Sequence, residues 1–385
     1  MKTKAAELIE QEIKRRGPMT FARFIDLALY HPTYGYYSRS VARRGRSGDY
    51  FTSLQVSPLF ASIFADALSA MRDQMDSDHF HLIEVASGGG EFLETLLGLL
   101  EREKKLKGLH VWAVDKSRAA RDLLFRRLSR FPKTHVVSSI DEVETVGGLE
   151  GCIFSNEFFD AIPFHRLVYT ASGFRELWVS LKEGEMVEEA GPLSEGLQGS
   201  VDALGAVSFV RGQQIELRPE AESTMAQWGS LINRGFVVTV DYGYPREELF
   251  RPDRLKGTWF CYRKHEAHER IFEAIGDQDI TAHVDFTRLA RAGLPSGLQP
   301  ALFCSQGVFL SHVGRERIER VLANPPGGTL PGGNLKDVSS SIQQLIHPEA
   351  MGEKFWTLIH AKGIKLPDLF AGIPNRLRRL GCQLS

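Results

Sequence analysis

The stretch His81-Leu-Ile-Glu-Val-Ala-Ser-Gly-Gly-Gly-Glu-Phe-Leu93 decides the fold of this chain. Its first five residues are mainly apolar and predict a buried strand. The glycines at 88–90 let the backbone turn sharply and approach a ligand closely, because glycine has no Cβ atom. Apolar residues then recur at helical spacing over 92–100. A strand, a glycine turn and a helix N-terminus are together typical of a nucleotide-type site, with free backbone amides directed at the ligand.

The alternation of strand and helix continues beyond this stretch. We expect strands at 81–86, 110–115, 134–138 and 151–155, and helices at 91–104, 117–129 and 139–146. This order predicts an α/β fold with a parallel, doubly wound sheet, whose strand ends and ligand lie along one edge. The second strand ends at Asp115, where such folds bind ribose hydroxyls, because a carboxylate can accept two hydrogen bonds.

The flanking segments have other patterns. Two amphipathic helices separated by Gly17-Pro18 are expected near the N-terminus, and short strands with glycine-rich connections follow residue 165. A polar loop rich in glycine and arginine precedes residue 53, and we expect it to fold over a ligand. The predicted organisation is a helical N-terminal segment with this loop at 1–49, a core at 50–165 and 221–320, a β-rich insertion at 166–220 and a C-terminal extension at 321–385.

Composition sets limits on partners and compartment. Of 385 residues, 43% are hydrophobic and 25% are charged, as in ordinary globular proteins. The formal net charge of −1 gives no electrostatic reason to expect nucleic acid as a partner. No apolar run approaches the ~20 residues needed to cross a bilayer, so we expect no membrane insertion. Four separated cysteines and the absence of a signal core predict a cytoplasmic protein with reduced thiols. Apolar helices near the N-terminus leave a homodimer open.

Acidic residues around the glycine turn narrow the choice of ligand. A nicotinamide dinucleotide site follows G-x-G-x-x-G, but Leu93 stands at the third glycine position. A P-loop needs lysine after its glycines, and Glu91-Phe92 excludes it. Glu84 suits the positive amino group of S-adenosylmethionine, and Asp115 suits its ribose. These residues favour a methyltransferase, while a dinucleotide enzyme and a binding or structural protein stay open.

Further blocks match a known family in order from about residue 20 to 355. The two most specific are Asn156-Glu-Phe-Phe-Asp-Ala-Ile-Pro163 and Thr281-Ala-His-Val-Asp-Phe286. Others are at 20–25, 31–37, 48–52, 84–90, 241–243, 306–309 and 351–352. The chain thereby resembles the S-adenosylmethionine-dependent methyltransferase family that includes the arginine methyltransferase of mitochondrial complex I assembly, mitochondrial dysfunction protein A. The resemblance implies a Rossmann-like class I methyltransferase core, S-adenosyl-L-methionine as cofactor, and a protein arginine, in a respiratory-complex-type subunit, as methyl acceptor.

Methyl transfer from a sulfonium needs an acceptor nitrogen held in line with the methyl group, so positioning supplies most of the rate. Carboxylates can hold a guanidinium through two hydrogen bonds. We therefore expect Glu157 to orient the substrate, with Asp160 supporting it and His265 as a further catalytic candidate; Asp241, His283 and Asp285 rank behind them. The expected cofactor-binding residues are Gly48, Asp49, Thr52, Glu84, Gly88, Gly90, Asp115 and Asn156. No metal is expected, because the spacing of His265 and His268 does not fit the HExxH motif.

The glycine turn also departs from the family pattern. Ala86-Ser87 stand where the family usually has Gly-Pro, and the extra Cβ can crowd the ligand or alter the loop. Two alternatives therefore remain beside protein arginine methylation. The chain could methylate a small molecule or another residue type, or it could be a catalytically weakened assembly factor that binds S-adenosylmethionine.

Overall fold

The computed structural model describes residues 2–39, 58–75, 77, 79–145, 148–264, 266–323 and 335–382. Contacts divide the chain into two compact units. The N-terminal unit comprises Met1–Tyr50, Phe159–Thr224 and Gly243–Arg288, and the core unit comprises Phe51–Phe158, Met225–Tyr242 and Leu289–Ser385. The domain boundaries given above from the sequence stay a prediction.

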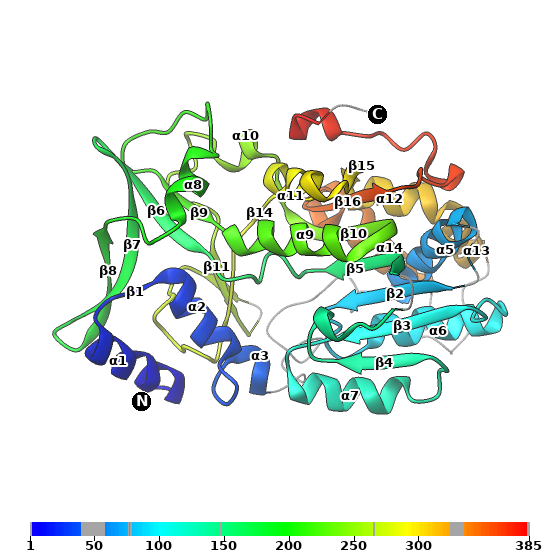
Figure 1. Ribbon diagram of the computed structural model, residues 1–385, viewed down its shortest axis with the longest axis horizontal. Helices are drawn as coiled ribbons and strands as arrows, with labels where there is room; N and C mark the ends of the chain where they lie inside the picture. The colour runs from blue at the N-terminus through cyan, green and yellow to red at the C-terminus, as the bar shows by residue number, and fades with distance from the viewer. Residues whose placement is uncertain are drawn as a thin grey trace. The chain divides into compact units, whose positions relative to one another are not determined.

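The core unit contains a twisted sheet with strand order β15-β16-β10-β5-β2-β3-β4 (Figure 1). Its strands are β2 (Phe80–Val85), β3 (Leu109–Val114), β4 (Thr134–Val137), β5 (Leu149–Asn156), β10 (Ile232–Tyr244), β15 (Gln299–Ser305) and β16 (Phe355–Lys362). The strands from β10 to β4 run parallel, whereas β16 is antiparallel to both of its neighbours. The predicted parallel α/β sheet is confirmed, and its carboxyl edge gathers the ends of β2, β3, β5 and β10.

Aromatic packing fixes helices against one face of this sheet. The helices that follow or flank its strands are α5 (Pro58–Met75), α6 (Glu91–Arg102), α7 (Arg118–Leu128), α9 (Pro219–Leu231), α12 (Gln306–Val313), α13 (Arg315–Ala323) and α14 (Leu335–Ile346). Phe92 of α6 stacks on Phe154 of β5 with ring centroids 4.5 Å apart. Phe64 of α5 lies 5.1 Å from the rings of both Phe154 and Phe309. Because these rings are fully buried, they hold the helix after the glycine turn in a fixed position.

The N-terminal unit has antiparallel sheets. One has the order β1-β7-β6-β9, with β8 paired to β7, and the other has the order β12-β11-β13. The strands are β1 (Met19–Thr20), β6 (His165–Thr170), β7 (Gly173–Lys182), β8 (Glu185–Gly191), β9 (Gln214–Leu217), β11 (Phe260–Arg263), β12 (Glu266–His268), β13 (Asp279–Thr281) and β14 (Val284–Asp285), which pairs with the end of β10. Helices are α1 (Lys4–Arg16), α2 (Phe21–Tyr30), α3 (Tyr36–Arg39), α8 (Leu197–Asp202), α10 (Arg246–Leu249) and α11 (Phe286–Ala292). The expected pair of N-terminal helices and the β-rich segment after residue 165 are both present.

One segment differs from what the sequence led us to expect. The helix predicted at 139–146 is wrong: among the described residues 139–145, only a 3-10 turn, Ile140–Glu142, forms. Ser139 and Glu142 close a capping box around that single turn, and Val143 is already extended. Strand β16, from the segment called a C-terminal extension, lies between β10 and β15 inside the sheet.

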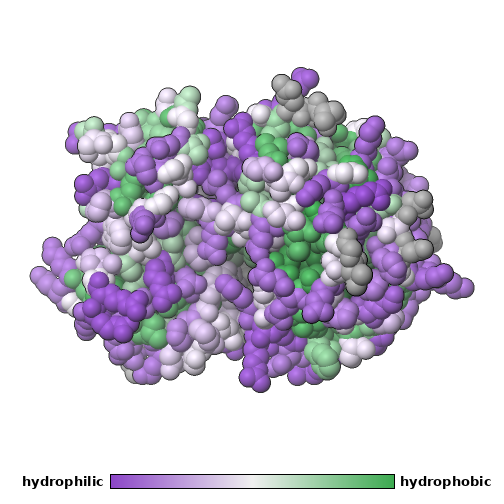
Figure 2. Space-filling view, in the orientation of Figure 1, coloured by the Kyte–Doolittle hydropathy of each residue, from purple (hydrophilic) through white to green (hydrophobic). Residues whose placement is uncertain are grey.

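The surface agrees with the composition. The face visible in Figure 2 is largely hydrophilic, with smaller apolar areas between the polar side chains. In the part of the chain that the structure describes, no helix combines the length and the apolar character needed to cross a membrane.

Candidate functional site

The glycine turn after β2 presents backbone to a ligand. Gly88 and Gly90 have positive φ angles of 56° and 83°. A Cβ atom on Gly90 would lie 2.7 Å from Cδ2 of Leu124, so the packing of α7 also requires glycine there. Gly90 is the N-cap of α6 and offers no side-chain cap. The first amides of this helix are therefore not capped by a side chain of residue 90, which suits the approach of a polar ligand.

Ala86 is the unexpected member of this turn. Its φ angle is 58°, in the left-handed region that glycine adopts readily and alanine does not. This is the position where the family pattern has glycine. Ala86 therefore adopts this turn conformation at a cost in backbone strain.

Glu84 is a buried carboxyl group near the end of β2. It is 3% exposed, and its Oε2 atom has no hydrogen-bond partner among the described residues. Burial raises the pKa of Glu84 well above its usual value of 4.5, and the charges of Glu91 and Asp115 act in the same direction. A buried acid with a vacant oxygen fits a cationic group such as the ammonium of an amino acid.

Asp115 joins the two turns at the ends of β2 and β3. It is 6% exposed. Its Oδ2 accepts the N–H of Gly88 at 2.9 Å, and its Oδ1 accepts the N–H of Ser117 at 2.8 Å. A carboxylate has about four acceptor positions, so two amide bonds leave capacity for hydroxyl donors. The geometry fits a ribose diol beside the glycine turn.

The end of the next strand, β5, carries a second group of candidate site residues. Asn156 ends β5, and its Nδ2 donates to Oε1 of Glu157 at 3.1 Å. Glu157 is half-buried and has a φ angle of 51°, although it is neither glycine nor asparagine. Phe158 follows and stacks on Trp228 of α9 at 5.5 Å. Residues held in this region of backbone space are concentrated at functional sites, because the surrounding structure must sustain their strain.

Asp160 belongs to the N-terminal unit. It is 5% exposed, and its Oδ2 accepts the hydroxyl of Thr281 at 3.0 Å. Arg218 fastens the same segment by donating to the backbone oxygens of Asp160, Ile162, Ala282 and His283. These contacts link the two most specific sequence blocks of the chain.

His283 and Asp285, which rank behind the main candidates, have surroundings typical of residues that stabilise the fold. His283 is partly buried, and the loss of solvent around its ring lowers its pKa to about 3. Asp285 accepts the N–H of Arg288 at 3.1 Å and lies beside Arg246, so it caps α11 within a partly buried ion cluster. Four predicted site residues, Gly48, Asp49, Thr52 and His265, lie outside the described residues.

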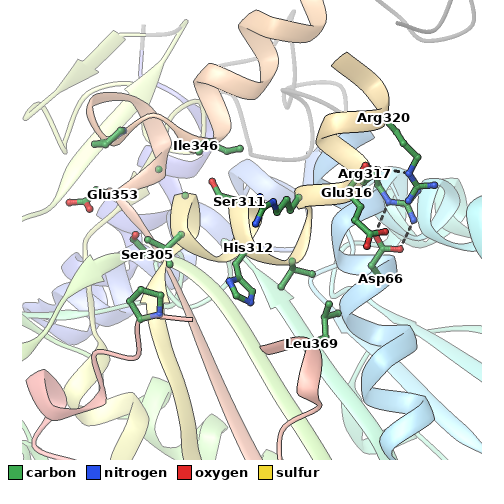
Figure 3. A pocket seen from close by; sticks show the side chains of 17 residues that line it. Asp66, Ser305, Ser311, His312, Glu316, Arg317, Arg320, Ile346, Glu353 and Leu369 are labelled. Atoms are coloured by element: carbon green, nitrogen blue, oxygen red, sulfur yellow. Dashed lines mark hydrogen bonds and ion pairs between the residues drawn. The ribbon is translucent and has the colours of Figure 1, made fainter. Parts of the chain in front are cut away.

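A separate cavity of about 1050 Å³ lies elsewhere in the core unit (Figure 3). Side chains of α5, α12 and α13 line it, and Asp66 of α5 points at Arg317 of α13 with an N–O distance of 2.7 Å. The cavity borders Ser305, the last residue of β15. Since β16, β10 and β5 separate β15 from β2, this cavity is distinct from the glycine-turn site.

The described residues thus gather two acids, a glycine turn and a strained glutamate at one sheet edge. S-adenosyl-L-methionine fits the two acids and the glycine turn. Its ammonium matches Glu84 and its ribose matches Asp115. It has no pyrophosphate, in agreement with Leu93 at the third glycine position of the dinucleotide motif. The described part of the chain gathers no group of three or more His, Cys, Asp or Glu side chains able to hold a metal ion.

Comparison with known proteins gives the same result. Residues 59–304, more than half of the chain, match the family described as "Putative S-adenosyl-L-methionine-dependent methyltransferase". A crystal structure of a Burkholderia thailandensis protein bound to S-adenosyl-homocysteine superposes with a TM-score of 0.86 at 27% identity, covering 97% of this chain and 96% of that one. The chain belongs to this family, and it is an S-adenosyl-L-methionine-dependent methyltransferase with a Rossmann-like fold.

Curated relatives are similar over most of their length. "Protein arginine methyltransferase NDUFAF7 homolog, mitochondrial" of Drosophila melanogaster is 24% identical over 93% of this chain and 85% of its own. "Protein arginine methyltransferase NDUFAF7, mitochondrial" of Homo sapiens is 25% identical over 89% and 80%. The expectation of a cytoplasmic protein is therefore wrong by this comparison, since these relatives are named as mitochondrial proteins.

Proposed function

We propose that this S-adenosyl-L-methionine-dependent methyltransferase methylates a guanidinium nitrogen of an arginine side chain in a protein. The observation that carries the proposal is Glu157, a half-buried carboxylate held in a left-handed backbone conformation at the carboxyl edge of the sheet. The names of the fruit fly and human relatives support the same acceptor. The resemblance to the complex I assembly family makes a respiratory-complex subunit the first protein to test.

The proposed chemistry assigns a role to each turn. When bound, the cofactor supplies a methyl group on a positively charged sulfur. Glu84 would hold the ammonium of the cofactor, and Asp115 with Gly88 and Gly90 would hold its ribose and adjoining atoms. Gly48, Asp49, Thr52 and Asn156 remain proposed members of this site.

Glu157 would act on the acceptor. A guanidinium keeps its proton at neutral pH, because its pKa lies far above 7. A fixed carboxylate can accept two of its hydrogen bonds, orient one nitrogen and receive the proton that this nitrogen loses. Asp160, three residues further along the chain, is proposed to support Glu157, and His265 remains a proposed catalytic residue.

Labelled methyl transfer tests the proposal. The purified protein is incubated with S-adenosyl-L-methionine carrying a labelled methyl group and with proteins from cells that lack this enzyme. Acid hydrolysis then identifies the labelled residue. Labelled methylarginine supports the proposal; label in another amino acid or in a small molecule would favour the alternative methyltransferase. Cofactor binding without any transfer would favour the weakened assembly factor, for which the strained Ala86 is the specific observation.

A further inference from the structure

We propose that Asp241 is a positioning residue for methyl transfer and that its carboxylate holds the turn that carries Glu157. This inference rests on the proposed function of Glu157. Asp241 lies near the end of β10 and is 0% exposed. A side chain buried to this extent does not contact a protein substrate, so any effect on the reaction must pass through its neighbours.

The contacts of Asp241 lead directly to the turn. Its Oδ2 accepts the N–H of Phe158 at 3.2 Å, and its Oδ1 accepts the N–H of Tyr242 at 2.9 Å. One carboxylate therefore connects β10 with the residue after Glu157. On the other side, the N–H of Glu157 donates to the backbone oxygen of Val240 at 2.9 Å. Hydrogen bonds to β10 thus hold both amides that flank the strained φ and ψ angles.

These hydrogen bonds counteract the backbone strain at Glu157. A left-handed conformation is strained for a non-glycine residue and persists only where neighbouring groups enforce it. The ladder bond at Glu157, the carboxylate at Phe158 and the stack of Phe158 on Trp228 supply this enforcement. If the acceptor at Phe158 is removed, the turn can relax to an ordinary φ angle and carry the carboxylate of Glu157 away from its position.

The conservative change is Asp241→Asn. It preserves size, but the asparagine amide has one acceptor oxygen, and its NH₂ group would face one of the two N–H donors. We expect turnover to fall by about tenfold or more, as for supporting residues elsewhere, with the affinity for S-adenosyl-homocysteine unchanged. Thr239→Val is the matched control: Thr239 is also buried, lies two residues earlier on the same face of β10, and its hydroxyl has no partner among the described residues.

A double-mutant cycle separates positioning from general destabilisation. Turnover is measured for Asp241→Asn, Glu157→Gln and the double variant. If Asp241 acts through Glu157, the Asp241 change has almost no further effect once Glu157 is replaced. An equal loss in both backgrounds would overturn the inference. If Asp241→Asn does not fold, Asp241→Glu is used in the same cycle, since it keeps the charge but shifts the carboxylate.

Hydrogen exchange provides a readout that needs no methyl acceptor. In Asp241→Asn, peptides spanning 156–159 should exchange faster, while those spanning 84–90 should not change. Unchanged exchange at 156–159 overturns the positioning role, whatever the enzyme methylates. Faster exchange together with a wild-type protein that methylates no arginine would instead overturn the proposed function alone.

Discussion

The turns after β2 and β5 have a similar backbone arrangement that is built from different residues. In each, a non-glycine residue has a positive φ angle: Ala86 at 58° and Glu157 at 51°. In each, a buried aspartate from the end of a neighbouring strand accepts an amide from the turn. Asp115 accepts the N–H of Gly88, and Asp241 accepts that of Phe158.

The difference lies in what each turn displays. The first turn continues into glycines, which bring bare backbone toward a ligand, and it is backed by the buried acid Glu84. The second turn displays a half-buried carboxylate supported by Asn156. The first turn offers backbone amides to a ligand, whereas the second presents a side chain. We therefore propose that the first turn binds the cofactor and that the second receives the methyl acceptor.

Glu157→Gln should give the largest effect. It keeps the size of the side chain but removes the charge that would orient a guanidinium and take its proton. We expect methyl transfer to fall by about a hundredfold or more, with the affinity for S-adenosyl-homocysteine within about twofold of wild type. Steady-state kinetics and calorimetry measure the two quantities. Full activity would remove Glu157 from the reaction.

Gly90→Ala should instead lower the affinity for the cofactor. The new Cβ would face Leu124 at 2.7 Å in a left-handed conformation, so cofactor affinity should fall by about tenfold. Gly184→Ala is the control, because Gly184 has a similar φ of 85° but has no atom within 4 Å of the added Cβ. Both variants should lose about 1–2 kcal/mol of stability from backbone strain, but only Gly90→Ala should weaken binding. Equal affinities would contradict the assignment.

The affinity for S-adenosyl-homocysteine, which has the same ammonium group as the cofactor, should rise with pH. Burial raises the pKa of Glu84 well above its usual value, so below that raised pKa the free protein holds a proton there that the bound ammonium displaces. Affinity should gain at most about tenfold per pH unit up to the raised pKa and should level off above it. Calorimetry in buffers of different ionisation enthalpy counts the released proton. Glu84→Gln should abolish that release; the same release in the variant would exclude Glu84 as its source.

The same pKa shift has a consequence for the ligand-free protein. Because the folded-state pKa of Glu84 is raised, its contribution to stability is complete below pH 4.5 and is lost as pH rises through the folded value. Denaturant unfolding of wild type and Glu84→Gln over this pH range should therefore converge at low pH.

Ala86→Gly should give the smallest effect. It relieves the left-handed alanine, but it also adds backbone freedom to the unfolded chain, so the net gain is about 0.5 kcal/mol. Thermal unfolding measures the gain. A gain accompanied by unchanged cofactor affinity would show that the alanine does not crowd the ligand; a large rise in affinity would support the weakened assembly factor.

The first turn could be predicted from the sequence and the second only in part. Three consecutive glycines after an apolar strand, with Glu84 before them and Asp115 after the next strand, specify the cofactor edge because local residue types determine it. Glu157 was identified as a candidate, but nothing in its residue type predicts a positive φ. The residue that follows it, Phe158, bonds to Asp241, which is more than eighty residues away in sequence, and stacks on Trp228 in α9. Such contacts arise from the pairing of β5 with β10, which residue patterns do not reveal.

A structure with S-adenosyl-homocysteine and an arginine-containing peptide from an identified substrate tests this division of roles most directly. We expect the ammonium of the ligand at Glu84, the ribose at Asp115, and the guanidinium of the peptide at the carboxylate of Glu157. A guanidinium bound away from Glu157, with the ligand still seated at the glycine turn, would contradict the central claim that the turn after β5 receives the methyl acceptor.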